Sequence, residues 1–463
     1  MKKIEISSEQ VAANKKILEE IRQSSHQKIK VAITDVDGIL RGKYLNKEKF
    51  LSSVDSGFGF CNVVFGWDSS DVCYDNAKYT GWHTGYPDAL ARIDLSTYRK
   101  VPWDGQVPFF LGEFENAEGN PLAICPRQIL KKVVADIGEA GFKAYSGMEF
   151  EWLNFKETPH SLAAKKYVDP EPLTPGMFGY SILRSTMNQP FFAAIMDELR
   201  DFRIPIEGLH TETGPGVYEA AILYSDPVEC ADRGVLFKSG VREIGYRFGI
   251  LPSFMAKWNS QLPGCSGHIH QSLWDKAGKS NLFYDAKDPH KMSDLFRSYL
   301  AGMLQCLPEI LPFFAPTINS YKRLVEGYWA PTRPNWGVDN RTVAFRVIPG
   351  SEKSTRLEAR VPGSDVNPYL AVAAALASGL YGIKKGLTLK DKPIVGNAYA
   401  DQKSERLPRN LYEATMRLQE SKMAREVLGD AFVDHFVSTR IWEWNQFQKS
   451  VTQWELQRYF EII

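Results

Sequence analysis

The chain has 463 residues, of which 44% are hydrophobic and 24% charged, as is typical of a globular protein large enough for more than one domain. Its 56 cations and 55 anions give a net charge of +1, so electrostatics offers no case for binding nucleic acid or an anionic membrane. No apolar run reaches the ~18 residues of a membrane span and none follows the first lysines, so we expect a cytoplasmic protein. The six cysteines contain no CxxC pair, which favours free thiols in a reducing compartment.

The first quarter of the chain is predicted to hold a helical arm and a small β-rich domain. Residues 1–28 are polar and amphipathic, which is typical of a helix. Residues 30–45 read as two strands around a turn at Asp37 and Gly38, which indicates a β-hairpin. Short strand-like runs continue beyond the hairpin, so we place the β-rich domain at residues 29–122.

The rest of the chain, residues 123–463, is predicted to be one large domain. Apolar residues at helical spacing predict a helix that begins near residue 126 and stops at Gly141. A second helix is well marked, with Asn367 as its cap and Gly386 at its end. The last 50 or so residues are expected to be mostly helical.

Several strand-like segments of the large domain have one apolar face and one polar face, because alternate side chains of a strand point to opposite sides. The polar faces carry Glu149 and Glu151, His268 and His270, Glu358 and Arg360, and Glu219 seven residues after Glu212. A solvent-facing strand is the commoner meaning of such alternation. The combination of carboxylates with imidazoles is instead a ligand set suited to Mg²⁺ or Mn²⁺.

Arginines form a second set in the same domain. They are Arg323, Arg341, Arg346, Arg356 and Arg360. A solvated basic face is the common interpretation, but the neighbours of Arg346 and Arg360 are apolar, which favours positions inside a site. Guanidinium groups bind carboxylate and phosphate, and arginines with a divalent metal are typical of phosphoryl transfer. The P-loop pattern is absent, so a P-loop enzyme is excluded.

At these residues the chain resembles the glutamine synthetase family. The resemblance rests on ordered segments that include "GMEFE", "PGVYEAAI", "HIHQSLW", "NSYKRLVEGY", "NRTVAFR" and "RLEARVPGSDVNPYLA". It implies an α+β fold, with a small N-terminal β-grasp domain and a large catalytic domain whose curved antiparallel sheet forms a funnel surrounded by helices. It also implies a homo-oligomer, a dodecamer of two hexameric rings, that uses ATP to convert glutamate to γ-glutamyl phosphate before an amine displaces the phosphate.

The resemblance also assigns roles to individual residues. It implies one metal ion at Glu151, Glu212 and Glu219, and a second at Glu149, His268 and Glu358. It implies catalytic roles for Arg323, Arg341 and Arg360. The implied substrate contacts are Gly264, His270, Arg323, Trp329 and Arg360, and the implied ATP contacts are Ser272, Trp274, Arg341, Arg346 and Arg356.

Three positions depart from the family pattern. Trp329 stands where ammonia-using members carry a glutamate, Pro263 replaces an asparagine of the shielding loop, and the loop around Trp67 and Asp68 is changed. Tryptophan cannot deprotonate ammonium, but it offers apolar surface and a π face to an organic amine. We therefore expect a glutamate–amine ligase. The alternatives are a true glutamine synthetase in which Trp329 only packs, and a non-catalytic structural homologue.

Overall fold

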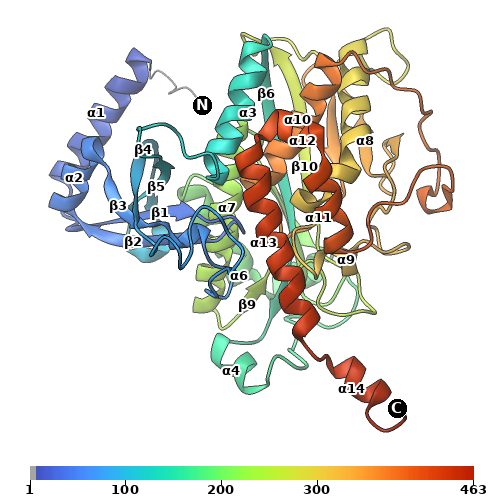
Figure 1. Cartoon of the computed structure of the whole chain (residues 1–463), viewed down its shortest axis with the longest axis horizontal. Coiled ribbons are helices and arrows are strands. Elements are labelled where there is room, and N and C mark those ends of the chain that lie inside the picture. The colour runs from blue at the N-terminus through green and yellow to red at the C-terminus, as the bar shows by residue number, and fades with distance from the viewer. Residues whose placement is uncertain (1–6) are drawn as a thin grey trace.

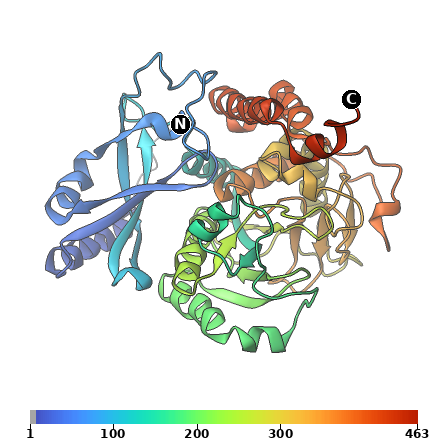
Figure 2. The ribbon, with the colours of Figure 1, turned by 90° about the horizontal axis from the view of Figure 1, so that it is seen from below.

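The computed structural model describes residues 7–463 and contains two β-sheets that lie in different parts of the molecule (Figure 1). The five-stranded sheet has the order β2-β1-β5-β4-β3, and all of its neighbours are antiparallel except β1 and β5. Its strands are β1 (Lys28–Thr34), β2 (Leu40–Asn46), β3 (Phe58–Cys61), β4 (Asp88–Val101) and β5 (Val107–Glu115). Helices α1 (Ser8–Gln23) and α2 (Lys47–Ser56) accompany this sheet on one side of the molecule (Figure 2).

The predicted hairpin is confirmed, since β1 and β2 pair antiparallel around a turn at Gly38. Gly38 has φ +81°, and a Cβ atom there would lie 3.0 Å from the Cα of Asn367. The turn therefore requires glycine both for its backbone conformation and for this close approach. The Asn367 amide also donates to the carbonyls of Asp35 and Val36, at 3.1 Å each. The hairpin turn is thus fixed to the start of a helix more than 300 residues later in the chain.

The large sheet has eight strands in the order β11-β12-β13-β10-β6-β8-β7, with β9 paired to β6. All neighbours are antiparallel except β11 and β12. The strands are β6 (Phe142–Phe155), β7 (Ile206–Thr211), β8 (Val217–Ile222), β9 (Leu251–Ser253), β10 (Gly267–Asp275), β11 (Trp336–Val338), β12 (Phe345–Ile348) and β13 (Arg356–Ala359). With the helices around it, this sheet confirms the predicted α+β class.

Helices surround the large sheet and form most of its core. They include α3 (Pro126–Glu139), α6 (Gln189–Asp201), α7 (Pro227–Arg247), α8 (Asp294–Phe314) and α10 (Pro368–Lys384), and the short helices α4 (Pro159–Ala164), α5 (Ile182–Met187) and α9 (Ser320–Arg323). The predicted cap of α10 is confirmed, because the Asn367 side chain accepts from the N–H of Tyr369 at 3.0 Å. The C-terminal region is helical as expected, with α11 (Leu411–Glu420), α12 (Lys422–Leu428), α13 (Asp430–Lys449) and α14 (Gln453–Tyr459).

The division of the chain at residues 28 and 122 stays a prediction, and residues 1–6 of the expected arm lie outside the described residues. The six cysteines are free thiols, as the sequence suggested. Among residues 7–463, none of the helices combines the length and the apolarity that crossing a bilayer requires.

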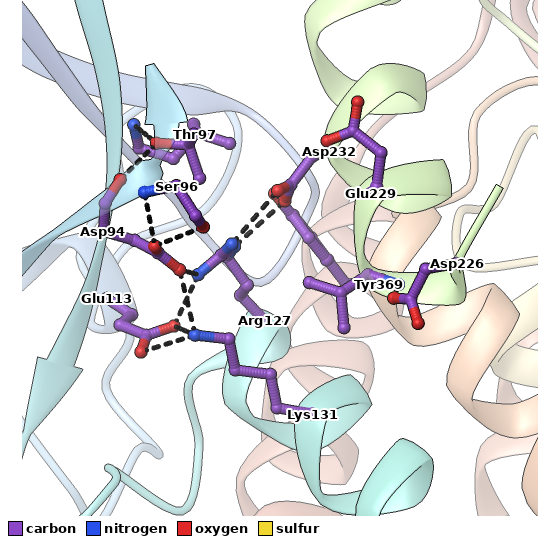
Figure 3. A network of polar contacts seen from close by, with 12 residues as sticks. Asp94, Ser96, Thr97, Glu113, Arg127, Lys131, Asp226, Glu229, Asp232 and Tyr369 are labelled. Atoms are coloured by element: carbon purple, nitrogen blue, oxygen red, sulfur yellow. Dashed lines mark hydrogen bonds and ion pairs between the residues drawn. The ribbon is translucent and has the colours of Figure 1, made fainter. Parts of the chain in front are cut away.

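A buried ionic network joins the two sheets through α3 and α7 (Figure 3). The Arg127 guanidinium donates to Asp94 of β4 at 2.8 Å, to Glu113 of β5 at 2.7 Å and to Asp232 of α7 at 2.9 Å. Lys131, one turn further along α3, also contacts Asp94 and Glu113. Burial raises the pKa of Asp94, but the charges of Arg127 and Lys131 outweigh it and hold that pKa well below its usual range.

Candidate active site

The central strands of the large sheet bring the predicted polar residues onto one face. Strand β6 lies between β10 and β8, so that Glu149 is opposite His268 and Glu151 is opposite Glu219. On the far side of β10, His270 is opposite Glu358 of β13. The alternate residues Met148, Phe150 and Trp152 are 1% exposed or less, so the strand faces predicted from alternation are correct.

Glu149 and Glu358 form one cluster with the two histidines of β10. The His268 Nδ1 atom lies 3.0 Å from Glu149 Oε1 and 3.4 Å from Glu358 Oε1, and His270 Nε2 lies 3.7 Å from Glu149 Oε2. One ligand atom each from Glu149, His270 and Glu358 fits within a 4.8 Å group. The resemblance implied His268 as the third ligand, whereas this group contains His270. Both imidazoles contact Glu149.

The carboxylates of this first cluster have low pKa values despite their burial. Burial raises the pKa of Glu358, but Arg360 and the two histidines lower it to about 2. Burial likewise raises the pKa of Glu149, and His268 and His270 hold it well below the usual range. Both groups are therefore anionic at neutral pH, which is the state that a metal ligand requires.

A second cluster forms where β7 and β8 meet. Ligand atoms of His210, Glu212 and Glu219 lie within 4.8 Å of one another, and His210 Nε2 is 3.1 Å from Glu219 Oε1. Burial raises the pKa of Glu219 to about 8, with Glu149 and Glu151 adding to the rise and His210 opposing it. Glu151 lies opposite Glu219, but its own carboxylate accepts from the N–H and hydroxyl of Ser266 at 2.8 and 2.9 Å.

Sequence reasoning missed His210 and the aromatic ring that covers it. His210 and Glu212 are two residues apart in "LHTE", the same alternation that marked the other ligands. The ring of Tyr180 stacks on His210 with centroids 4.3 Å apart. Tyr180 comes from a separate segment, and its N–H donates to the carbonyl of Thr211 at 2.6 Å.

The donor chemistry of the two clusters fits divalent cations. Carboxylates crowd on one face, and the crowding contributes to the raised pKa of Glu219. The Nε2 atom of buried His268 has no hydrogen-bond partner in the described structure. Carboxylate oxygens with imidazole nitrogens are ligands that Mg²⁺ and Mn²⁺ accept.

The implied arginines differ in their partners. Arg360 contacts the Glu358 carboxylate, and Arg346 NH1 donates to the same carboxylate at 3.0 Å. Arg323 is buried, and within the described residues its guanidinium donates to the carbonyls of Val361 at 2.8 Å and Arg360 at 3.2 Å. Within residues 7–463, Arg323, Arg341 and Arg356 form no ion pair with a carboxylate, and the side chain of Arg341 is exposed.

Gly264 lies directly against Arg323. A Cβ atom at Gly264 would be 2.3 Å from the carbonyl of Ala256 and 2.8 Å from Cγ of Arg323. Only glycine allows so close an approach. The implied substrate contacts Gly264 and Arg323 are therefore neighbours in the structure.

A pocket of about 300 Å³ opens beside the first cluster. Three of the implied ATP contacts, Ser272, Trp274 and Arg356, line it together with Glu149 and His270. Arg341 and Arg346 are outside its lining. Sequence reasoning missed Tyr145 and Tyr224, which form an aromatic wall with Trp274. Tyr145 stands edge-on to Tyr224 and to Trp274, with ring centroids 5.9 and 5.6 Å apart.

Trp329 occupies an exposed position in the loop after α9. Its side chain is 56% exposed, and its backbone has φ +61°. The preceding Tyr328 ring lies 4.1 Å from the ammonium of Lys257. Burial raises the pKa of the Tyr399 hydroxyl, and Arg360 and Arg323 oppose the shift. The loop itself follows directly on α9, which ends at Arg323.

The changed loop around Trp67 and Asp68 makes its contacts elsewhere. The Asp68 carboxylate accepts from the N–H groups of Ser70 and Val72 in its own turn. It also accepts from the indole of Trp442 on α13, at 3.2 Å. Within one chain this carboxylate is therefore committed to a structural turn.

Comparison with known proteins assigns the family. The model of "Glutamine synthetase, catalytic domain" matches residues 123–459. "Type-1 glutamine synthetase 2" of Dictyostelium discoideum is 58% identical, with 96% of this chain and 86% of the relative covered. "Glutamate--isopropylamine ligase" of a Pseudomonas species is 37% identical, with 97% and 98% covered.

Among solved structures, one described as "GmaS/ADP complex-Conformation 1" superposes with a TM-score of 0.84. It is 26% identical in sequence, and the match covers 96% of this chain and 99% of that one. The chain belongs to the glutamine synthetase family of ATP-dependent glutamate ligases.

Proposed function

We propose that this enzyme joins the γ-carboxylate of glutamate to an organic amine, with γ-glutamyl phosphate as the intermediate. The observation that carries the proposal is Trp329, whose exposed indole lies in the loop that follows Arg323 of α9. An indole offers a large apolar face and a π surface to an alkyl or aryl amine, and offers no carboxylate to bind ammonium. The likeness to a glutamate–isopropylamine ligase supports the same conclusion.

The metal ligands are proposed from the two carboxylate clusters. Glu149, His268 and Glu358 would hold one divalent ion, with His270 adjacent to it, and Glu151, Glu212 and Glu219 would hold the other. When bound, Mg²⁺ or Mn²⁺ supplies Lewis-acid neutralisation of phosphate and carboxylate oxygens. The low pKa values of Glu149 and Glu358 keep these ligands anionic.

The arginines and the pocket are proposed to bind the two larger substrates. Arg323, buried without an acidic partner, would bind the glutamate carboxylate in the space that Gly264 leaves open. Arg341, Arg346 and Arg360 would neutralise the ATP phosphates as charge develops during transfer. Ser272, Trp274 and Arg356 would border the nucleotide within the aromatic pocket.

A true glutamine synthetase is the second candidate, favoured by the 58% identity to a protein named as one. The two functions differ in the nucleophile alone. Glutamate-dependent phosphate release from ATP should be measured with ammonium, methylamine, isopropylamine, ethanolamine, putrescine and aniline, with mass spectrometry of the products. Turnover far higher with an organic amine supports the proposal, and turnover highest with ammonium contradicts it.

The Trp329→Ala variant tests the residue itself. We expect kcat/KM for the preferred organic amine to fall by about 10-fold relative to that for ammonium, as for a lost apolar contact in a pocket. Tyr246→Ala removes a comparably exposed aromatic side chain, 64% exposed, from the end of α7 and should change neither value. Equal losses for both nucleophiles in Trp329→Ala would mean that the indole only supports the loop.

We also infer that the enzyme is a homo-oligomer of two hexameric rings in the cytoplasm. The C-terminal helix α14 extends away from the rest of the chain (Figure 1). Trp454 of this helix, at 59% exposed, and Phe460 and Ile463 after it, at 84% and 94%, are apolar side chains that a partner would cover. The free cysteines fit a reducing compartment. Light scattering should give a dodecameric mass that falls when residues 452–463 are deleted.

A further inference from the structure

The loop that carries Trp329 has a strained backbone at its tip. Trp329 has φ +61°, a left-handed conformation that a bulky side chain keeps only where its surroundings impose it. On the C-terminal side, Ala330 is fully buried. On the N-terminal side, Tyr328 is half-buried, and the centroid of its ring lies 4.1 Å from the Nζ atom of Lys257. The conformation of Trp329 therefore depends on what holds its two neighbours.

Lys257 is held firmly in the segment between β9 and β10. Its backbone N–H donates to Oδ1 of Asn319 at 2.8 Å, and its carbonyl accepts from Nδ2 of the same side chain at 2.7 Å. The same segment places Gly264 against Arg323, where a Cβ atom would lie 2.8 Å from Cγ of the arginine. The contact between Lys257 and Tyr328 therefore joins the Trp329 loop to the segment that packs on the buried site arginine.

The ammonium of Lys257 lacks an anionic partner. Lys257 is 5% exposed, and within residues 7–463 its Nζ atom forms neither an ion pair nor a hydrogen bond. Burial lowers the pKa of Lys257, and the charge of Arg323 acts in the same direction. The face of an aromatic ring attracts a cation, and the attraction is strongest where water is excluded. The Tyr328 ring is therefore the contact that compensates this cation within the described residues.

We propose that Lys257 is a positioning residue for the amine, because its contact with Tyr328 holds Trp329 in the conformation that presents the indole to an organic amine. The inference rests on the proposed role of Trp329 in binding that amine. Once Tyr328 is released, the left-handed backbone of Trp329 relaxes and the indole leaves its place. Glutamate and ATP, which the proposal assigns to other residues, are bound as before.

Hydrogen exchange followed by mass spectrometry on the full-length enzyme tests the contact directly. Lys257→Met keeps the length of the side chain and loses its charge, so amides of residues 324–330 should exchange about 10-fold faster than in the parent. Tyr328→Leu should have the same effect, and Lys257→Arg, which keeps a cation for the ring, should exchange slowly. Lys385→Met is the matched control, because its ammonium lies 5.3 Å from the Tyr381 ring at the end of α10, and it should leave these amides unchanged.

Steady-state kinetics tests whether the contact serves the amine. Lys257→Met should raise KM for the preferred organic amine by about 10-fold and change KM for glutamate and for ATP by less than about 2-fold. Lys257→Arg should restore KM for the amine. In the Trp329→Ala background, Lys257→Met should add no further rise, since the contact acts through the indole.

Three outcomes would overturn the inference. Unchanged exchange in both Lys257→Met and Tyr328→Leu would show that the contact does not hold the loop. A rise in KM for glutamate as large as that for the amine would place Lys257 in the glutamate site. An equal rise in KM for the amine with and without Trp329 would show that Lys257 acts independently of the indole. A parent enzyme that prefers ammonium contradicts the proposed function, and the exchange measurement still decides whether Lys257 holds the loop.

Discussion

The charged cluster around Arg127 and the charged cluster around Glu149 and Glu219 differ in how their charges are balanced. In the first, Asp94, Glu113 and Asp232 each have a cationic partner within hydrogen-bond distance. In the second, Glu151 accepts from a serine and Glu219 contacts a histidine. The pKa of Asp94 is lowered, whereas in the second cluster the pKa of Glu219 is raised to about 8 and that of Glu149 is lowered by its two histidines.

This difference distinguishes a structural cluster from a functional one. The Arg127 network is complete within the chain and joins β4 and β5 to α7 (Figure 3). The sheet face around Glu219 holds an excess of carboxylates that a bound cation would neutralise. Substitutions should therefore affect stability in the first region and activity in the second.

The largest effect is expected at Arg127. Arg127→Met removes the cation that the buried carboxylates share, and should lower the free energy of unfolding by about 3–5 kcal/mol, as for other broken buried pairs. Urea unfolding followed by circular dichroism measures the change. Arg200→Met, at an arginine 60% exposed beside Asp197, is the surface control and should leave the midpoint unchanged. Equal midpoints for the two variants would show that the network contributes no stability.

Glu219→Gln should lower activity without lowering stability. Because the pKa of Glu219 is raised to about 8, this carboxyl is mostly protonated in the metal-free protein at neutral pH. The neutral glutamine should therefore leave the urea midpoint equal to that of the parent or higher. Turnover should fall by roughly 100-fold or more, as when a group that organises transition-state charge is lost. A large loss of metal-free stability would place Glu219 with the structural charges.

Divalent metal provides the next comparison. Mn²⁺ or Mg²⁺ at about 100 times its Kd should stabilise the parent protein by about 2.7 kcal/mol per site against an EDTA-treated sample. Glu149→Gln should lose the part of the gain that comes from the site of Glu149, His268 and Glu358, and keep the part that comes from the site of Glu151, Glu212 and Glu219. Lys131→Met, a substitution in the Arg127 network, should keep the whole stabilisation by metal, because Lys131 contacts Asp94 and Glu113 and not the site. A gain in Glu149→Gln as large as the parent's would contradict the proposed ligand set.

The smallest effect is expected at His210, which contacts Glu219 at 3.1 Å. If His210 positions that carboxylate, His210→Phe should weaken Mn²⁺ binding by about 10-fold, the lower end for supporting partners of metal ligands. His210→Asn retains a polar group and should restore part of the affinity. Electron paramagnetic resonance of free Mn²⁺ measures both variants, and unchanged affinity in His210→Phe would show that the imidazole does not position Glu219.

Local rules of the sequence predicted much of this structure. Alternation placed Glu149 and Glu151 on one face of their strand and His268 and His270 on one face of theirs, and the structure joins the two strands. Capping placed the start of α10 at Asn367. The resemblance supplied the family, and with it the arginines. His210 was not predicted, although it lies on the same strand face as Glu212. Its pairing with Glu219 on the neighbouring strand was not visible in the sequence.

The sequence by itself determined the strand faces, the hairpin turn, the helix caps and the inventory of acids, histidines and arginines, because each depends on residues a few positions apart. The tertiary structure alone decided which charges meet. Arg127 is 105 residues from Asp232, and Glu151 is 115 from Ser266, so only strand order and helix packing could assign one carboxylate to a balanced junction and another to the crowded sheet face of the site.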